Sequence, residues 1–258
     1  MPVAAGLHYF LHEGGSHSHA PVVFIHGEGG DHLSWPSELR RLPGHRSYSL
    51  DLPGHGKSGG PGLQSVPGYA RSVVEFLDAA GLGRAVLVGQ GMGGAIALSV
   101  AADSPERAAG IVLIASGARL PVASTLLENS ANPATLPLAL QALLAAICSL
   151  QTEARLRESV SRRLSALRPT LLHGDLLACD SFDLTARLGS IRTPALVICG
   201  TEDKFTPLIY AETLASSLPG AALQTIDGAG HLVCLEQPRR LAGLLTIFLG
   251  TVPYVPGG

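Results

Sequence analysis

The sequence predicts an α/β protein whose mostly parallel central sheet is flanked by helices. Short β-branched runs alternate with longer helical patterns along most of the 258 residues. This alternation is typical of parallel sheets, whose strands are joined by crossover helices. One long segment between two predicted strands lacks a strand pattern, which indicates a helical insertion.

The alternating pattern assigns each element in chain order. Strands are predicted at residues 7–13, 21–26, 47–51, 85–88, 110–115, 195–199 and 222–226. Helices are predicted at residues 34–42, 66–80, 92–102, 207–217 and 239–249. The Gly-, Ser- and His-containing segment 12–20 is expected to form a turn between two antiparallel strands.

Residues 117–190 form the predicted insertion. They include helical stretches such as 138–150 and 152–167, and a Pro-marked strand follows them. Ligands of open α/β sheets bind at the carboxyl ends of the strands, where such an insertion would form a cap. We therefore expect a core of residues 1–116 and 191–258 under a helical cap of residues 117–190, with an apolar pocket because the cap is rich in Leu and Ala.

Composition and charge exclude several classes of protein. The chain has 18 Lys and Arg against 20 Asp and Glu, a net charge of −2, which argues against a nucleic-acid binder. The hydrophobic share of 46% supports a sizeable core, and no apolar run is long enough for a membrane span. The four cysteines form no CxxC pair and no leader pattern is visible, so we expect a cytoplasmic protein. No metal site is expected, since His12, His17 and His19 are better explained by a polar turn.

Several predicted strands end in loops with distinctive sequences. These loops are HGEGG at 26–30, DLPGHGKS at 51–58, GQGMGG at 89–94, GTEDKFTP at 200–207 and GAGH at 228–231. The ordered set resembles the α/β-hydrolase superfamily across nearly the whole chain. The resemblance implies an α/β-hydrolase fold and an ancestry among esterases and related acyl or carbon–carbon bond hydrolases, acting on a small and mainly apolar substrate without a cofactor.

The resemblance also assigns catalytic positions. The family nucleophile lies in Gly-x-Ser-x-Gly on a sharp strand-to-helix turn, followed along the chain by the acid and the histidine. Asp203 matches the acid, with Glu202 as a fallback, and His231 matches the general base. The nucleophile position holds Gly91, which has no side chain and cannot attack a carbonyl.

Two more positions depart from the family pattern. Gln90 precedes Gly91, and Glu28 stands where a small or apolar residue is common. The backbone N–H groups of Glu28 and Met92 match the family's two oxyanion-hole donors. We expect the Glu28 side chain to project beside Gly91 and to act as a general base if an apolar pocket raises its pKa. The alternative is that it turns to solvent or pairs with a nearby cation.

Other candidates carry less specific signals. Trp35 is assigned to the substrate pocket with Gln90, although anchoring of its own helix is an alternative. His26 and His55 are interpreted as loop organisers. The Gly89–Gly94 loop formally matches a dinucleotide fingerprint, but it follows several strands instead of opening the first βαβ unit, so no nucleotide cofactor is expected.

Three further side chains carry a group that can react. Ser34 and Ser116 are conceivable substitute nucleophiles, but neither has a recognisable partner base. Cys234 is interpreted as a core thiol. Two functions therefore remain open: an enzyme refitted for general-base chemistry by Glu28 or the His231–Asp203 dyad, and an inactivated serine esterase or non-catalytic ligand-binding protein.

Overall fold

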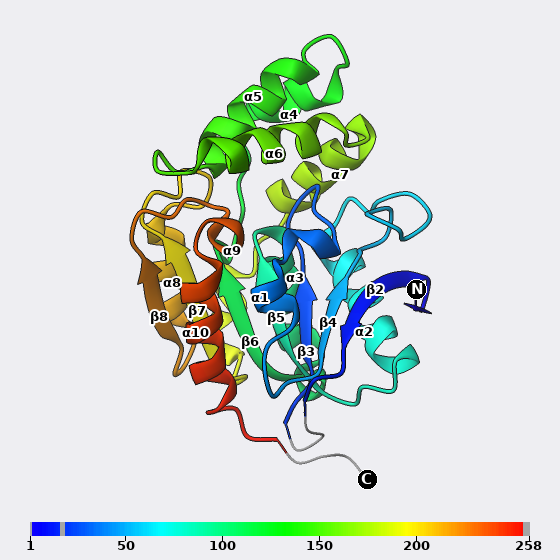
Figure 1. Cartoon of the computed structure of the whole chain (residues 1–258), viewed down its shortest axis with the longest axis vertical. Helices are drawn as coiled ribbons and strands as arrows, with labels where there is room; N and C mark the ends of the chain where they lie inside the picture. Colours follow the sequence, from blue (N-terminus) through cyan, green and yellow to red (C-terminus); the bar gives the residue numbers. More distant parts are fainter. Residues whose placement is uncertain (1, 16–18, 255–258) are drawn as a thin grey trace.

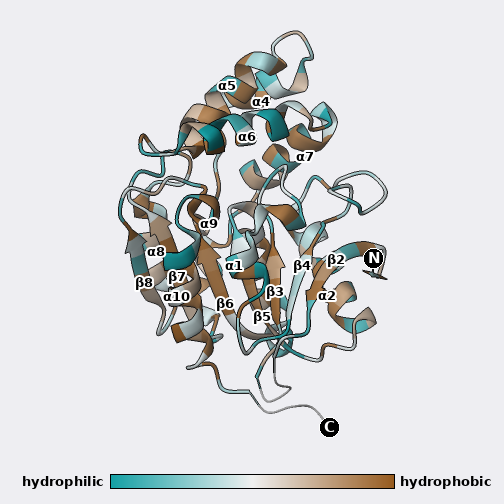
Figure 2. Cartoon of the chain, in the orientation of Figure 1, coloured by the Kyte–Doolittle hydropathy of each residue, from teal (hydrophilic) through white to brown (hydrophobic). Residues whose placement is uncertain are grey.

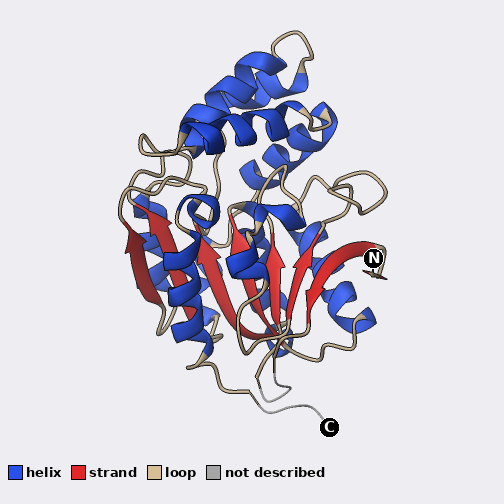
Figure 3. Cartoon of the chain, in the orientation of Figure 1, coloured by secondary structure: helices blue, strands red, loops and turns tan. Residues whose placement is uncertain are grey.

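The computed structural model describes residues 2–15 and 19–254 and contains one twisted central sheet between two layers of helices (Figures 1 and 3). Over these residues the sheet has eight strands in the order β1-β2-β4-β3-β5-β6-β7-β8. The β1–β2 and β2–β4 pairs are antiparallel, and every later pair is parallel. The chain therefore has the predicted α/β-hydrolase architecture.

The predicted strands correspond to β2 to β8. The bounds are β1 Val3–Ala4, β2 Leu7–His12, β3 Val22–Ile25, β4 Ser47–Leu50, β5 Ala85–Gln90, β6 Ala108–Ile114, β7 Ala195–Gly200 and β8 Ala222–Ile226. β2 and β3 run in opposite directions, as expected, but β4 lies between them. Residues 16–18 of the predicted turn lie outside the described part of the chain.

The helices lie close to their predicted positions with one exception. Their bounds are η1 His32–Ser34, α1 Ser37–Arg40, α2 Val66–Ala79, α3 Met92–Asp103, η2 Pro105–Arg107, α4 Ser124–Ala131, α5 Leu136–Ile147, α6 Ala154–Ser165, α7 Pro169–Asp180, η3 Thr185–Ser190, α8 Leu208–Ser217, α9 Val233–Glu236 and α10 Pro238–Leu249. The helix predicted at 34–42 is wrong in length, because Pro36 disfavours helical geometry at Trp35, which is extended. Only α1 remains of it.

The sheet divides the core into two parts. Side chains of β3 alternate between them: Val23 and Ile25 pack toward α2, α3 and α8, whereas Val22 and Phe24 pack toward α1 and α10. The central strands β3, β5 and β6 are correspondingly apolar in Figure 2. Full burial of each such side chain contributes roughly 1.5–3 kcal/mol, so the sheet is a rigid support for the loops at its carboxyl ends.

Four helices, α4 to α7, are inserted between β6 and β7 and lie beyond the carboxyl ends of the strands (Figure 1). We call them the α4–α7 layer. An isolated bridge between Arg119 and Asp183 joins the two ends of this insertion. Among the described residues, no helix combines the length and apolar character needed to cross a membrane.

Candidate active site

Gly91 forms the sharp turn between β5 and α3. Its φ of 55° and ψ of −121° lie in a region that residues with a side chain adopt only under strain. Two residues later, a side chain at Gly93 would collide with the backbone of Ile25 and His26. Glycines therefore bring this turn close to β3 and place position 91, which is buried, at the carboxyl edge of the sheet.

Two ionisable side chains flank Gly91. A Cβ atom at this position would lie 2.8 Å from Oε2 of Glu28 and 3.1 Å from Nε2 of His231. The Glu28 side chain is 6% exposed and the His231 side chain 1% exposed. The acidic side chain thus projects beside Gly91, as the sequence leads one to expect, and does not turn to solvent.

The Glu28 carboxylate contacts two groups that a serine hydrolase uses for catalysis. The Met92 N–H donates a hydrogen bond of 3.2 Å to Oε2. Oε1 lies 3.4 Å from Nε2 of His231, within ion-pair distance but without hydrogen-bond alignment. The N–H that the family resemblance assigns to a substrate oxygen is therefore bonded to a side chain of this protein.

The surroundings of Glu28 lower its pKa. Burial acts to raise it, but the His231 imidazole and the N–H groups of Glu28 and Met92 outweigh that effect. The expectation that an apolar pocket raises this pKa is therefore wrong. The carboxyl is ionised at neutral pH, so it is available as a base, although a weak one.

On its other side, His231 faces Asp203. Its Nδ1 lies 3.0 Å from Oδ2 of Asp203. The N–H groups of Phe205 and Thr206 each donate to Oδ1 at 2.8 Å, and the Thr206 hydroxyl donates to Oδ2 at 2.6 Å. These contacts lower the pKa of Asp203 against the opposing effect of burial. The carboxylate therefore fixes the imidazole orientation.

Burial disfavours the charged form of His231, but the carboxylates of Asp203 and Glu28 overcome it and raise its pKa to about 10. The imidazole is consequently protonated at neutral pH. This disagrees with the expected role of His231 as general base. Both nitrogens of a protonated imidazole already carry a proton, so the ring cannot accept another. In this state His231 can donate a proton from Nε2.

A cavity of about 70 Å³ lies next to this pair. Polar groups of its wall include Glu28, Gln90, His231, Ser34 and Arg163. The apolar wall comes mainly from α5, α6 and the segment after His231, with Leu143, Ile147, Val160, Leu164, Leu232 and Leu235. A second cavity of about 10 Å³ lies on the Gly91 and Met92 side, and Glu28 lines both.

The pocket assignments have different outcomes. Gln90 lines the larger cavity and donates from Nε2 to the His231 carbonyl at 3.3 Å, so it helps to hold the histidine loop. Trp35 lines neither cavity; it is fully buried and packs on Phe24 with ring centroids 4.9 Å apart. Its assignment to the pocket is wrong, because the extended backbone before Pro36 directs the indole into the core.

The remaining sequence candidates have contacts that account for them. Glu202 accepts hydrogen bonds from Leu150 N–H and the Gln151 amide, so it is not the acid partner of His231. Ser116 donates its hydroxyl to the Gly91 carbonyl at 2.8 Å and thereby supports the turn. Burial raises the pKa of Cys234 to about 12, so its thiol is unreactive.

Loop-organising contacts surround His26 and His55. His26 accepts the Leu52 N–H at Nε2, whereas Nε2 of His55 lies 2.8 Å from Oδ2 of Asp175. Asp175, in α7, also accepts the Gly29 N–H at 2.8 Å. Sequence reasoning missed Asp175, since nothing in its local sequence marks it. Thr206 was also missed, although the Asp-x-x-Thr spacing is a usable signal for a side-chain-to-backbone turn.

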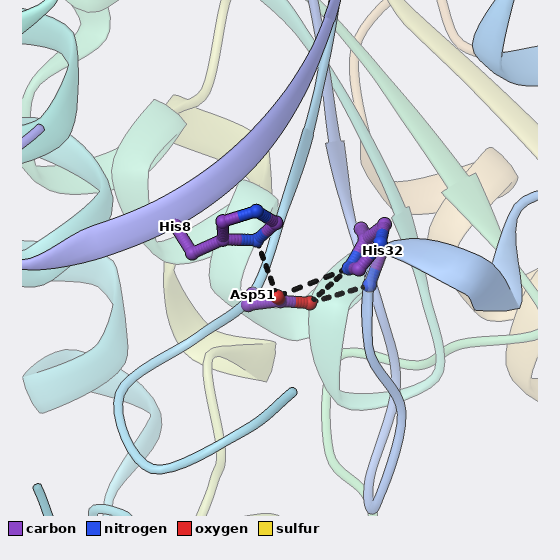
Figure 4. A group of neighbouring side chains, drawn as sticks. All are labelled: His8, His32 and Asp51. Atoms are coloured by element: carbon purple, nitrogen blue, oxygen red, sulfur yellow. Dashed lines mark hydrogen bonds and ion pairs between the residues drawn. The ribbon is translucent and has the colours of Figure 1, made fainter. Parts of the chain in front are cut away.

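One buried cluster has the residue types of a metal site: His8, His32 and Asp51 (Figure 4). Nδ1 of His8 lies 2.7 Å from the Asp51 carboxylate and Nδ1 of His32 lies 2.8 Å from it. The N–H groups of His32 and Lys57 donate to the same carboxylate. Four donors already occupy the carboxylate, so hydrogen bonding accounts for the cluster without a metal.

The comparison with protein families agrees with the mostly parallel eight-stranded sheet and its flanking helices. A family model described as the alpha/beta hydrolase fold matches residues 20–238. The chain belongs to the α/β-hydrolase family. Its similarity to solved members of this fold includes a hydrolase from Pseudomonas aeruginosa PA01, with TM-score 0.85, 29% identity and coverage of 95% of this chain and 94% of that one.

Several other similar proteins have names that state an activity. The chain is 30% identical to a putative carbamate hydrolase of Variovorax paradoxus, over 97% of this chain and 99% of that protein. It is 30% identical to a 2-hydroxy-6-oxo-6-phenylhexa-2,4-dienoate hydrolase of Comamonas testosteroni, over 88% and 87% of the two chains. It spans 63% of the length of a 30% identical dihydrolipoyllysine-residue acetyltransferase component from Cupriavidus necator. A thermophilic esterase structure is 32% identical with TM-score 0.82, covering 95% of this chain and 98% of that one.

Proposed function

We propose that this chain is a hydrolase-type enzyme that works on a small, mainly apolar substrate without a covalent intermediate at position 91. In this proposal Glu28 is the general base and His231 the general acid. The observation that carries it is the ionised carboxylate 3.4 Å from a protonated imidazole, both beside Gly91. The similarity to hydrolases and an esterase supports hydrolysis as the reaction class.

The proposed reaction balances protons within the pair. Glu28 takes a proton from water as the water oxygen bonds to the substrate carbonyl carbon, and Nε2 of His231 gives a proton to the departing group as its bond breaks. Glu28 is then neutral and His231 is neutral. Return of the proton from Glu28 to His231 restores the resting pair, and Asp203 stabilises the imidazolium throughout.

The α4–α7 layer supports the apolar-substrate part of the proposal. Its helices α5 and α6 contribute Leu143, Ile147, Val160 and Leu164 to the cavity wall. We propose that residues 117–190 act as a cap over a core of residues 1–116 and 191–258. The four cysteines are free and buried, which supports the expected reducing, cytoplasmic location.

The test is turnover of a panel of p-nitrophenyl esters, lactones and activated ketones by wild type and Glu28→Gln. The substitution keeps the shape but removes the base, so kcat should fall by roughly 10²–10⁴-fold. Glu158→Gln, an exposed glutamate on α6, is the matched control and should leave kcat unchanged. Unchanged kcat in Glu28→Gln with loss of activity in His231→Ala would transfer the base role to the histidine, and activity surviving both changes would refute the proposal.

A second candidate is a ligand-binding protein without turnover. The observation that favours it is the hydrogen bond from Met92 N–H to Glu28, which leaves this donor engaged before any substrate arrives. Ligands from the same panel would then raise the melting temperature of the wild type without product formation. Product formation at a rate that depends on Glu28 would exclude this candidate.

A further inference from the structure

We propose that the space between the start of α3 and His231 is a binding site for a carboxylate, occupied in the resting protein by the Glu28 side chain. Shortening this side chain would let a free monocarboxylate of acetate size bind in its place. The inference concerns binding alone, so it does not depend on the proposed reaction.

Two groups on opposite sides of the Glu28 carboxylate define the site. On one side, the Met92 N–H at the first turn of the 12-residue helix α3 donates to Oε2, and helix N-termini favour anions. On the other side is Nε2 of His231, which is buried and has no hydrogen-bond partner among the described residues. A protonated imidazole and a backbone donor, one at each oxygen of the Glu28 carboxylate, are together complementary to an anion with two oxygens.

The size of the ligand follows from the side chain itself. Glu28→Ala removes the γ-carbon and the carboxyl group, which are the same heavy atoms that acetate contains. The backbone N–H of residue 28 is kept. Because Glu28 lines both the larger cavity and the one beside Gly91, its truncation joins these two spaces. Acetate can supply the lost carboxylate if it shifts into the joined space, because its methyl group must keep a van der Waals distance from the Cβ that remains at position 28.

Charge determines which molecules compete. In Glu28→Ala, Asp203 still faces Nδ1 of His231 at 3.0 Å and favours the protonated ring. A neutral molecule of the same shape, such as acetamide, can accept a hydrogen bond from Nε2 but has no negative charge to pair with the imidazolium, so it binds more weakly. In the wild type the tethered carboxylate is present at a high effective concentration, so external carboxylates are excluded.

The experiment measures sodium acetate binding by titration calorimetry and by melting temperature at slightly acidic pH, with sodium chloride at equal ionic strength as the reference. Glu28→Ala should bind acetate at least about tenfold more tightly than wild type, and acetamide should bind this variant more weakly than acetate does. Glu158→Ala on α6 is the matched control and should behave like wild type. Equal acetate binding by wild type and Glu28→Ala, or equal effects of acetate and acetamide, would overturn the inference.

Two further measurements keep the test independent of any single variant. The double variant Glu28→Ala/His231→Gln lacks the cation and should lose acetate binding, whereas retained binding would place the anion elsewhere. If Glu28→Ala does not fold, the nitrogen resonances of His231 decide the question in wild type and Glu28→Gln. An unchanged His231 titration in Glu28→Gln would show that the carboxylate does not occupy this site, and a fall in the His231 pKa would support it.

Discussion

Oδ2 of Asp175, in helix α7, lies 2.8 Å from the backbone nitrogen of Gly29, the residue that follows Glu28. The same oxygen lies 2.8 Å from Nε2 of His55, and the Tyr69 hydroxyl donates to Oδ1 at 2.7 Å. Asp175 is fully buried. One carboxylate in the α4–α7 layer therefore fixes the loop that carries Glu28.

Replacement of Asp175 by Asn should destabilise the protein. The amide cannot accept all three hydrogen bonds, and it leaves buried donors without a partner, so the free energy of unfolding should fall by about 3 kcal/mol. Urea denaturation measures this loss, and amide exchange at Gly29 should become faster. The exposed Glu158→Gln provides the control; protection of Gly29 equal to wild type in Asp175→Asn would contradict the assigned role.

Restoring a serine at position 91 should not by itself restore ester hydrolysis. In Gly91→Ser the Cβ lies 2.8 Å from Oε2 of Glu28, and the positive φ costs about 1–2 kcal/mol. Glu28 also keeps the Met92 N–H engaged. We expect no burst of p-nitrophenol from p-nitrophenyl acetate with this single variant.

The double variant Gly91→Ser/Glu28→Ala removes the two obstacles that Glu28 presents, its close approach to a Cβ at position 91 and its hydrogen bond with the Met92 N–H. The oxyanion donors become available, and His231 loses one neighbouring carboxylate, so its pKa falls and it can accept the serine proton. A burst in the double variant, absent from Glu28→Ala alone, is the expected result. A burst of the same size in Gly91→Ser alone would mean that Glu28 does not block the oxyanion hole.

The stability of the protein should depend on pH through the Glu28–His231 pair. The folded-state pKa of His231 is raised from 6.5 to about 10, so its stabilising contribution is complete below 6.5 and is lost as pH rises toward about 10. The pKa of Glu28 is lowered from 4.5, so its contribution is present above 4.5 and is lost at lower pH. The difference in unfolding free energy between wild type and Glu28→Gln should therefore be largest in the intermediate range and shrink on both sides. If the difference in unfolding free energy between wild type and Glu28→Gln did not change with pH from below 4.5 to about 10, the Glu28–His231 ion pair would be excluded.

Chelation should leave the protein unchanged. The Asp51 carboxylate already accepts hydrogen bonds from His8, His32 and the Lys57 N–H. EDTA should therefore not alter the melting temperature, while Asp51→Asn should lower it equally with and without EDTA. A decrease caused by EDTA in wild type but not in Asp51→Asn would indicate a metal at this cluster.

The sequence predicted those parts of the site that are local in the chain. Gly91, Asp203 and His231 each follow a strand of a parallel sheet, and the carboxyl ends of such strands meet at one edge. Their proximity could be derived from the order of strands and loops. The glycine turn is similarly local, because residues 89–94 determine it by the absence of side chains.

The rest depends on packing between distant segments. The direction of the Glu28 pKa shift was wrong because one close imidazole and the backbone N–H groups outweigh the effect of burial. Asp175 in α7 contacts three residues that precede it in the chain by 146, 120 and 106 positions. No local sequence pattern predicts contacts over such separations. The shorter length of α1 could have been predicted from the sequence, since Pro36 disfavours helical geometry at the residue before it.

The charge balance of the Glu28–His231 contact has a consequence for calorimetry of any ligand. A neutral ligand that displaces the Glu28 carboxylate leaves Asp203 as the main counterion of the His231 imidazolium. The pKa of His231 therefore falls. A carboxylate ligand keeps the charge balance as it was. Near the pH at which His231 titrates, the heat of binding of a neutral ligand will therefore vary with the ionisation enthalpy of the buffer, because the protein releases protons as the ligand enters.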